Sequence, residues 1–554
     1  MGTLTIDEIR RPKLSGELPV KSQCLPFDQI PHTSPLFSDF LSYSPQIRQF
    51  YPRSPRPAEW MKSEAASLRY DSTRRQRVAD ILERQNKAWG ASAKSLANID
   101  RLRKGAFAMV SGQQVGLFGG PLMTIFKALT AAKLAEQANH AGIECVPVFW
   151  LATTDHDLEE INHVAALDGA WMLQELRAST QGVAGAPVGG ITFGQDIQPV
   201  VEAAISLLGE SEVSGWLRDA YDPGQTFGSA FAKLCTRLFA EWGVILLDAA
   251  DSELHRVAEP VYLSVIARTA EINDALLHRG AELEAASYHQ QVKVTASSTL
   301  LFALRDGARV PVHRRPDGDF EIEGSKVSRT DLLEQITSAP ENFSANALLR
   351  PVVQDYLLPT IAYSGGPAEV AYFAQAAVVY ESVLNRTTPI VPRFSATLVE
   401  AKPQGLLERY KLQLTDVFEG PETLREKIAV GTLPRDLQSA FEQAATSLDK
   451  SLAAIRQELE RLDPTLVDSA TNAATKMQYQ LNQLQAKAAR AELRQTEVLG
   501  RHAQLLSNAL YPNKSLQERE ITGVFFVARH GAEVLRGVYD AINLDCLDHQ
   551  VMSI

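Results

Sequence analysis

A strand, a glycine-rich turn, a helix and a second strand follow one another between residues 106 and 152, and this order constrains the fold more than any other feature. The apolar run AFAMVS (106–111) is typical of a buried strand, and SGQQVGLFGG continues it. PLMTIFKALTAAKLAEQANHAG (121–142) has the pattern of a helix, and CVPVFWLA (145–152) that of a strand. Such a unit needs a right-handed crossover and parallel strands. The sequence therefore predicts an α/β domain with a parallel sheet.

Other segments extend or interrupt this sheet. GVILLDAA (243–250) and TIAYSG (360–365) are short apolar runs, which we expect to be a third and a fourth buried strand. Residues 292–327 differ, because the turn sequences RDGAR and RPDGD separate segments in which apolar and polar residues alternate. We therefore expect an antiparallel meander inserted into the parallel domain.

The last third of the chain carries the pattern of a long helical hairpin. Apolar residues recur at steps of three or four over 437–462 and again over 466–491, and LDPT (462–465) separates the two runs. Two antiparallel helices with such seams form a coiled coil. After it, VFFVARHG (524–531) is expected to be a strand or a short helix that returns to the core.

The chain therefore divides into four regions. The first hundred residues combine Pro-rich turns with one polar helix expected around 73–95, and are predicted to wrap on the core as an extension. The predicted regions are this extension (1–100), an α/β core (101–400), an α-helical coiled-coil domain (401–510) and a C-terminal segment returning to the core (511–554).

Composition and charge exclude several partners. The 55 Lys and Arg against 66 Asp and Glu give a net charge of −11, which repels phosphate backbones, so nucleic acid is not expected as a partner. No apolar leader and no run of about eighteen apolar residues occurs, which predicts a cytoplasmic chain without a membrane partner. The four cysteines form no C-x-x-C pair, so we expect buried, unpaired thiols in a reducing compartment and no zinc site.

The glycine-rich turn predicts a site for an anion. Glycines at the end of a strand let the backbone approach a ligand, and the next helix presents unpaired N–H groups and a positive dipole end. Neither G-x-x-x-x-G-K-[ST] nor G-x-G-x-x-G is present, which argues against an ordinary nucleoside triphosphatase or dinucleotide-binding domain. From this stretch alone, a turn needed only for close packing remains an equal alternative.

A second copy of the turn strengthens the hypothesis of an anion site. AYSGGPAEVAYFAQAA (362–377) repeats the order strand, Gly-Gly-Pro, helix, with Pro367 where the first turn has Pro121. If the two strands are parallel neighbours, two helix N-termini face one crevice beyond the carboxyl ends of the strands.

Polar residues gather directly after the second predicted strand, in TTDHDLEEINHV (153–164). Asp155, His156 and Asp157 are our candidates for catalytic acid-base groups, because such groups are often placed at strand ends. His156 and His163 lack H-E-x-x-H spacing, so no metal site is expected. The alternative is a solvated loop whose acids cap a helix.

Two arginines flank the second Gly-Gly-Pro turn in the sequence. Arg350 precedes it and Arg393 follows the next apolar run, and together they could bind a carboxylate bidentately. For either arginine taken singly, a structural salt bridge is the better interpretation.

Four long stretches of the sequence resemble one known family, the bacillithiol biosynthesis cysteine-adding enzymes (BshC). The stretches are SGQQVGLFGGPLMTIFKALTAAKLA, VPVFWLATTDHDLEEINHV, LLRPVVQDYLLPTIAYSGGPAEVAYFAQ and PIVPRFSATLVE. The resemblance implies a Rossmann-like core with inserted segments, here at about 170–240 and 265–345, and a coiled coil that forms a homodimer. It implies substrate-site positions at Gly112, Gln113, Gln114, Gly119, Gly120, Asp155, His156, Asp157, Asn162, Arg350, Gly365, Gly366, Glu369 and Arg393.

The resemblance also implies an activity, the final step of bacillithiol synthesis. In this step cysteine is joined through an amide bond to the glucosamine nitrogen of glucosaminyl-malate. Malate is a dicarboxylate, which suits glycine-lined helix N-termini and arginines, and the two amines suit acidic side chains. Amide formation needs an activated carboxyl, so ATP (or ADP) with Mg²⁺ is the expected cofactor, giving a cysteinyl adenylate or phosphate, although no metal-ligand motif is present.

Two other interpretations remain open from the residues. One is a nucleotidyl- or acyl-transferase acting on another dicarboxylate, and the other is a coiled-coil scaffold without catalytic activity.

Overall fold

The computed structural model describes residues 22–180, 182–430, 435–493 and 497–554. At its centre lies a parallel sheet with the order β13-β12-β2-β3-β6. The strands are β2 (Phe107–Gln113), β3 (Cys145–Leu151), β6 (Ile245–Asp248), β12 (Thr360–Gly365) and β13 (Ile390–Pro392). This is the strand order of a doubly wound, Rossmann-like fold. The predicted α/β class is therefore confirmed, and β13 is a strand that the sequence analysis had not predicted.

The strand order reverses between β2 and β12, which lie side by side in the middle of the sheet. β2 leads toward helix α5 (Met123–His140) and β12 toward helix α14 (Pro367–Leu384). The interior residues of both strands are buried, as expected for central parallel strands with layers on both faces. Doubly wound sheets bind ligands beyond the carboxyl ends of the strands at such a reversal. Both glycine-rich turns begin there.

The first insertion lies between β3 and β6 and consists of a β-hairpin and helices. Its elements are α6 (Leu158–Ile161), β4 (His163–Leu167), β5 (Leu173–Arg177), α7 (Ile197–Leu208), α8 (Glu212–Ala220) and α9 (Phe227–Leu238).

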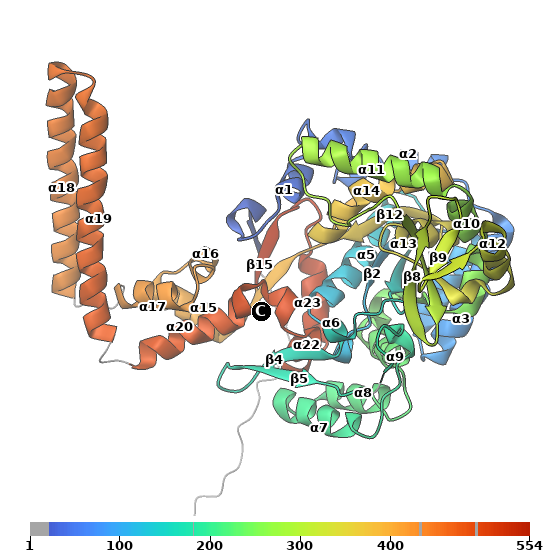
Figure 1. The fold of residues 1–554 in the computed structure, drawn as a ribbon. Coiled ribbons are helices and arrows are strands. Elements are labelled where there is room, and N and C mark those ends of the chain that lie inside the picture. The colour runs from blue at the N-terminus through green and yellow to red at the C-terminus, as the bar shows by residue number, and fades with distance from the viewer. Residues whose placement is uncertain (1–21, 181, 431–434, 494–496) are drawn as a thin grey trace, which may run out of the picture.

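The second insertion lies between β6 and β12 and contains the predicted meander, an antiparallel sheet of order β10-β9-β8-β7-β11 (Figure 1). Its elements are α10 (Ser252–Ala267), α11 (Thr269–Ala285), β7 (Ser298–Arg305), β8 (Ala308–Arg314), β9 (Phe320–Ile322), β10 (Ser325–Val327), α12 (Arg329–Ser338), β11 (Phe343–Ala345) and α13 (Arg350–Leu357).

The N-terminal region packs on the core, but the expectation of one polar helix around 73–95 is wrong. Two helices form here, because Gly90 has a positive φ of 75° and Ser92 caps the second helix by accepting from the Ser95 N–H. The described elements of the region are β1 (Ser22–Leu25), α1 (Pro35–Ser42), α2 (Met61–Ser67), α3 (Ser72–Ala88) and α4 (Ala93–Lys104).

The C-terminal region is helical, and α18 and α19 project from the body as the predicted antiparallel hairpin (Figure 1). Its helices are α15 (Ala401–Tyr410), α16 (Leu414–Val417), α17 (Pro421–Val430), α18 (Arg435–Leu462), α19 (Leu466–Leu493), α20 (Glu497–Leu510), α21 (Gln517–Glu520), α22 (Gly523–His530) and α23 (Glu533–Ala541). The stretch 524–531 falls in α22, so it returns to the core as a helix. In the described part of the chain, no helix has the length and apolar character needed to cross a bilayer.

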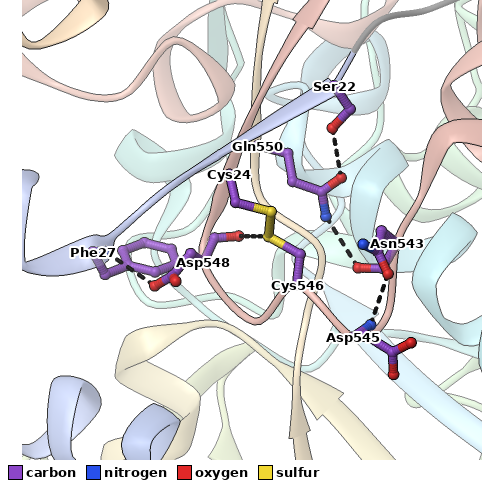
Figure 2. The surroundings of a disulfide bond; sticks show 8 residues. All are labelled: Ser22, Cys24, Phe27, Asn543, Asp545, Cys546, Asp548 and Gln550. Atoms are coloured by element: carbon purple, nitrogen blue, oxygen red, sulfur yellow. Dashed lines mark hydrogen bonds between the residues drawn. A yellow bond between two sulfur atoms is a disulfide. The ribbon is translucent and has the colours of Figure 1, made fainter.

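A small sheet joins the first and the last described strands of the chain. β15 (His549–Ser553) lies between β1, with which it is antiparallel, and β14 (Ala396–Val399), with which it is parallel. Cys24 of β1 and Cys546, in the loop before β15, form a disulfide with their Cα atoms 6.5 Å apart (Figure 2). The prediction of four unpaired thiols is therefore wrong for these two cysteines, since a separation of 522 residues hid their proximity. Cys145 and Cys235 are free and buried, as predicted.

Candidate functional site

A cavity of about 580 Å³ opens at the carboxyl ends of β2, β3 and β12. The body of the sheet forms its floor, and the second insertion contributes a wall through Phe302 and Arg309. The predicted residues that line it are Gly112, Gln113, Gln114, Asp155, His156, Arg350, Gly366, Glu369 and Arg393. Several other lining residues were not predicted as site residues, among them Lys127, Glu160, Lys293, Arg309, Asn346 and Arg519.

The first Gly-Gly-Pro turn does not reach the cavity, contrary to the expectation that both turns face one crevice. The Gly119 N–H donates to the Tyr221 hydroxyl, and the Gly120 carbonyl accepts from the Thr522 hydroxyl. At the same turn the Leu122 N–H donates to the Ile521 carbonyl at 2.8 Å. The C-terminal segment thus covers this helix mouth, so Gly119 and Gly120 have a packing role.

Three further predicted residues lie outside the cavity. Asp157 caps α6, accepting from the Glu160 N–H, and buried Asn162 accepts from Arg177 at 2.8 Å in the first insertion. A Cβ on Gly365 would lie 2.8 Å from Cβ of Glu369, so this glycine permits close packing of strand and helix. The helix-cap alternative therefore holds for Asp157.

The second Gly-Gly-Pro turn does open into the cavity, and Glu369 organises it. The Glu369 carboxylate accepts from the Gly366 N–H at 2.8 Å and from the Tyr363 hydroxyl at 2.5 Å. Lys127 Nζ lies 2.6 Å from the same carboxylate. Burial alone would raise the pKa of Glu369, but Lys127 and these donors lower it overall. Glu369 is therefore an ionised group at the floor of the cavity.

Lys127 ties the end of β2 to the first turn of α14, the helix that follows β12. Besides Glu369, its Nζ donates to the Gly112 carbonyl at 2.9 Å and to Gln113 Oε1 at 2.8 Å. These contacts use all three hydrogens of an ammonium group. Burial lowers the pKa of Lys127 to about 8, against the opposing effect of Glu369. A lysine within the otherwise apolar start of the helix at 121–142 was the signal for this residue in the sequence.

Asp155 and His156 lie on the opposite wall, where the second insertion meets the sheet. Gln114 donates to Asp155 at 3.0 Å, and Arg309 donates to His156 Nδ1 at 3.1 Å. With Nδ1 as acceptor, the neutral imidazole carries its proton on Nε2. Arg309 also covers the Phe302 ring at 4.0 Å, and burial lowers the pKa of its guanidinium to about 10. This wall combines a carboxylate and an imidazole suited to proton transfer.

The arginines of the cavity are of two kinds. Arg393 pairs with Glu518 at 2.5 Å, so the salt-bridge interpretation holds for it, yet its buried Nε has no hydrogen-bond partner within the described structure. Arg350 donates to the Tyr372 hydroxyl at 2.6 Å. Among the residues described, neither Arg350 nor Arg519 lies within salt-bridge distance of a carboxylate.

The cavity therefore has a positive lining in a negatively charged chain. Six of its lining residues are basic and three, Asp155, Glu160 and Glu369, are acidic. Since Glu369 is already paired with Lys127, the excess positive charge remains available to a ligand. Buried guanidinium groups bind carboxylates and phosphates through charge-assisted hydrogen bonds. The arrangement fits a ligand with at least two anionic groups.

Comparison with known proteins gives matches along nearly the whole chain. The family model described as "Bacillithiol biosynthesis BshC, N-terminal Rossmann-like domain" matches residues 20–394, and the model "Bacillithiol biosynthesis BshC, C-terminal coiled-coil domain" matches residues 396–554. A Koribacter versatilis protein named "Putative cysteine ligase BshC" is 46% identical over 96% of this chain and 99% of its own length. A Solibacter usitatus protein of the same name is 34% identical over 96% of this chain and 99% of its own length. A Salinibacter ruber protein of that name is also 34% identical, over 94% of this chain and 96% of its own length.

Proposed function

The chain belongs to the BshC family of bacillithiol biosynthesis, as the sequence resemblance predicted, and from this we propose that it is a cysteine ligase. It joins the carboxyl group of L-cysteine to the glucosamine amine of glucosaminyl-malate, which is the last step in making bacillithiol. The observation that carries the proposal is the positively lined cavity at the strand-order reversal, where Arg350 and Arg519 have no carboxylate partner among the described residues.

The charges of the cavity support this choice of substrate. The two carboxylates of the malate group would bind Arg350, Arg519 and the unpartnered Nε of Arg393. The glucosamine amine would then face the acidic wall formed by Asp155 and Glu160, both held by Gln114. Arg350 is partly buried without a carboxylate partner among the described residues, which costs free energy that a scaffold protein has no need to spend.

The reaction requires proton transfer as well as binding. The amine attacks the activated cysteine carboxyl, the amide bond forms, and the amine loses a proton. Asp155 is the group that we propose accepts it, because its side chain is about one-third exposed and lies on the cavity wall. His156, with its Nε2–H directed by the Arg309 contact to Nδ1, would donate a hydrogen bond to the departing group and stabilise its developing negative charge.

We propose ATP with Mg²⁺ as the source of activation. ATP would supply the energy that makes the cysteine carboxyl reactive. Arg309 and Lys293, the lining cations that the malate group would leave free, fit its phosphates. Mg²⁺ commonly binds through substrate phosphates and one or two carboxylates, so it would arrive with the nucleotide.

We further propose a cytoplasmic homodimer, assembled through the hairpin of α18 and α19. The support is an exposed apolar face, in which Ile455, Met477 and Leu484 each keep about half of their surface accessible. Ala444, Leu448 and Leu481 line a groove beside Met477 and Leu484. Exposed seams of this kind are normally covered by a partner helix.

The reaction is tested directly with purified protein, glucosaminyl-malate, cysteine and Mg-ATP. We expect a thiol product with the mass of the two substrates minus one water. Product that forms equally without ATP would remove the nucleotide from the proposal and keep the ligase. If none forms, and malate, glucosaminyl-malate, cysteine and ATP all leave the unfolding temperature unchanged, the cavity is not a substrate site.

A further inference from the structure

The Cys24–Cys546 disulfide is open to solvent on one side. Cys24 lies on the exposed edge strand β1, whereas Cys546 lies half-buried in the loop before β15. In Figure 2 the bond spans the junction between the first described strand and the last. In a reducing compartment, such as the one we propose for this chain, disulfides are usually redox-responsive. Exposed disulfides are also the ones that exchange with small thiols.

The strand next to the disulfide is connected to the cavity by buried side chains. On β15, His549 contacts Ser395 through Nδ1 at 2.8 Å and Thr397 through Nε2 at 2.8 Å. The Ser395 hydroxyl donates to Glu518 at 2.9 Å, and Glu518 accepts from Arg393 at 2.5 Å. Arg393 lines the cavity. The position of β15 therefore helps to fix an arginine of the site.

Among the described residues, a short ladder and a few hydrogen bonds hold β1 on β15 besides the disulfide. Four residue pairs form the ladder, from Ser22–Met552 to Leu25–His549. Two hydrogen bonds support this ladder. The Ser22 hydroxyl donates to Gln550 Oε1 at 3.1 Å, and the Phe27 N–H donates to Asp548 Oδ1 at 3.2 Å. A short edge strand frays readily without a covalent tie.

We infer that the Cys24–Cys546 disulfide is an exchange site for low-molecular-weight thiols, and that opening it loosens the β1-β15-β14 sheet behind Arg393. A thiolate attacks Cys24 Sγ, forms a mixed disulfide there, and expels Cys546 as a thiolate, which takes a proton. A second thiolate attacks the mixed disulfide and releases Cys24. The protein disulfide gains two electrons, and two small thiols become one small disulfide.

The inference that this exchange regulates the ligase site rests on the proposed function, in which cysteine is a substrate and bacillithiol is the product. Both are low-molecular-weight thiols. The exchange chemistry itself needs no substrate. A failed ligase assay would therefore leave the tests of the disulfide interpretable.

The first test maps the thiols of the folded, full-length protein after incubation with cysteine. Iodoacetamide labelling and peptide mass spectrometry should find Cys24 and Cys546 labelled, and an intermediate with cysteine attached to Cys24. Cys145 and Cys235 should stay unlabelled, because they are buried and burial raises the pKa of each thiol. Labelling of Cys24 only after unfolding, or no disulfide after treatment with cystine, would overturn the exchange site.

The second test asks whether the sheet responds. After reduction, hydrogen–deuterium exchange of peptides covering β14 and β15 should be faster by about threefold or more, while β3 stays unchanged. Cys546→Ser should show the same increase without any thiol. Ser22→Ala is the matched control, because it removes one bond between the same strands and keeps the disulfide. Equal exchange in Cys546→Ser and the oxidised wild type would overturn the connection to the sheet.

Discussion

Arg393 and Glu518 form a buried ion pair across the boundary between the Rossmann-like region and the helical C-terminal region, with Nη2 and Oε1 2.5 Å apart. Burial alone would raise the pKa of Glu518, but Arg393 lowers it overall, so the carboxyl stays ionised. Arg393 also accounts for one wall of the cavity. The C-terminal segment therefore completes the site, although the strands that carry most of the cavity precede it in the chain.

Breaking this pair should cost more than removing it. Arg393→Met leaves Glu518 charged and buried, which should lower the free energy of unfolding by about 3–5 kcal/mol. Arg393→Met combined with Glu518→Leu should recover a large part of that loss, because no unpaired charge remains. Urea unfolding of the two single variants and the double variant measures this coupling. Strictly additive effects would mean that the two side chains do not depend on each other.

Asp155 and His156 should be needed for turnover but not for folding. Both side chains lie on the cavity wall, so Asp155→Asn and His156→Ala should each reduce product formation by about 100-fold or more. Because both side chains are partly exposed, the unfolding temperature should stay nearly unchanged. Asp157→Asn is the matched control, because Asp157 lies outside the cavity and asparagine also caps helices. Full activity in the first two variants would return this wall to the interpretation of a solvated loop.

Arg350 should carry much of the binding of the malate group. Among the described residues, the Arg350 guanidinium hydrogen-bonds only the neutral Tyr372 hydroxyl, so Arg350→Met removes a cation without leaving a buried carboxylate unpaired. We expect malate to raise the unfolding temperature of the wild type and not that of this variant. Arg237→Met changes an exposed arginine and should keep the effect of malate. Equal protection of both variants would exclude Arg350 from the site.

Four of the five buried parallel strands, and the position of the cavity at their carboxyl ends, could be predicted from local patterns. Buried parallel strands form continuous apolar runs, and the turns after β2 and β12 contain the residues that need special backbone geometry. Which Gly-Gly-Pro turn faces the ligand could not be predicted, because Ile521 and Thr522 cover the first turn from about 400 residues further along the chain. Arg309, Arg519 and the Cys24–Cys546 pair depend on similar long-range contacts, which leave no periodic pattern in the sequence.

The homodimer proposal predicts that the hairpin face controls assembly. Met477→Glu together with Leu484→Glu places charges in the exposed apolar face, so the protein should change from dimer to monomer and remain folded. Asn482 is exposed on the same helix but does not line that groove, so the control variant Asn482→Glu should stay dimeric. Light scattering gives the mass of each variant. A monomeric wild type would show that this face is not a dimer interface.

Stability should fall with acid because of His549. Burial lowers the pKa of His549 from 6.5 to about 4. Below about pH 6.5 the unfolded chain binds a proton that the folded chain does not bind until about pH 4, so acidification across this window favours unfolding. The loss amounts to at most about 1.4 kcal/mol per pH unit for one group. His549→Gln should reduce the slope of the unfolding free energy against pH by up to that amount, whatever its effect on stability at neutral pH.

His255 provides an independent check of the same reasoning. Burial lowers its pKa to about 4 as well, although it lies on α10 beside Tyr262 and has no contact with β15. His255→Gln should therefore remove a similar increment of the pH dependence, and the double variant should lose both. Urea unfolding at several pH values between 4 and 7 measures the slopes. A double variant as acid-sensitive as the wild type would mean that other groups, such as paired carboxylates, dominate in this window.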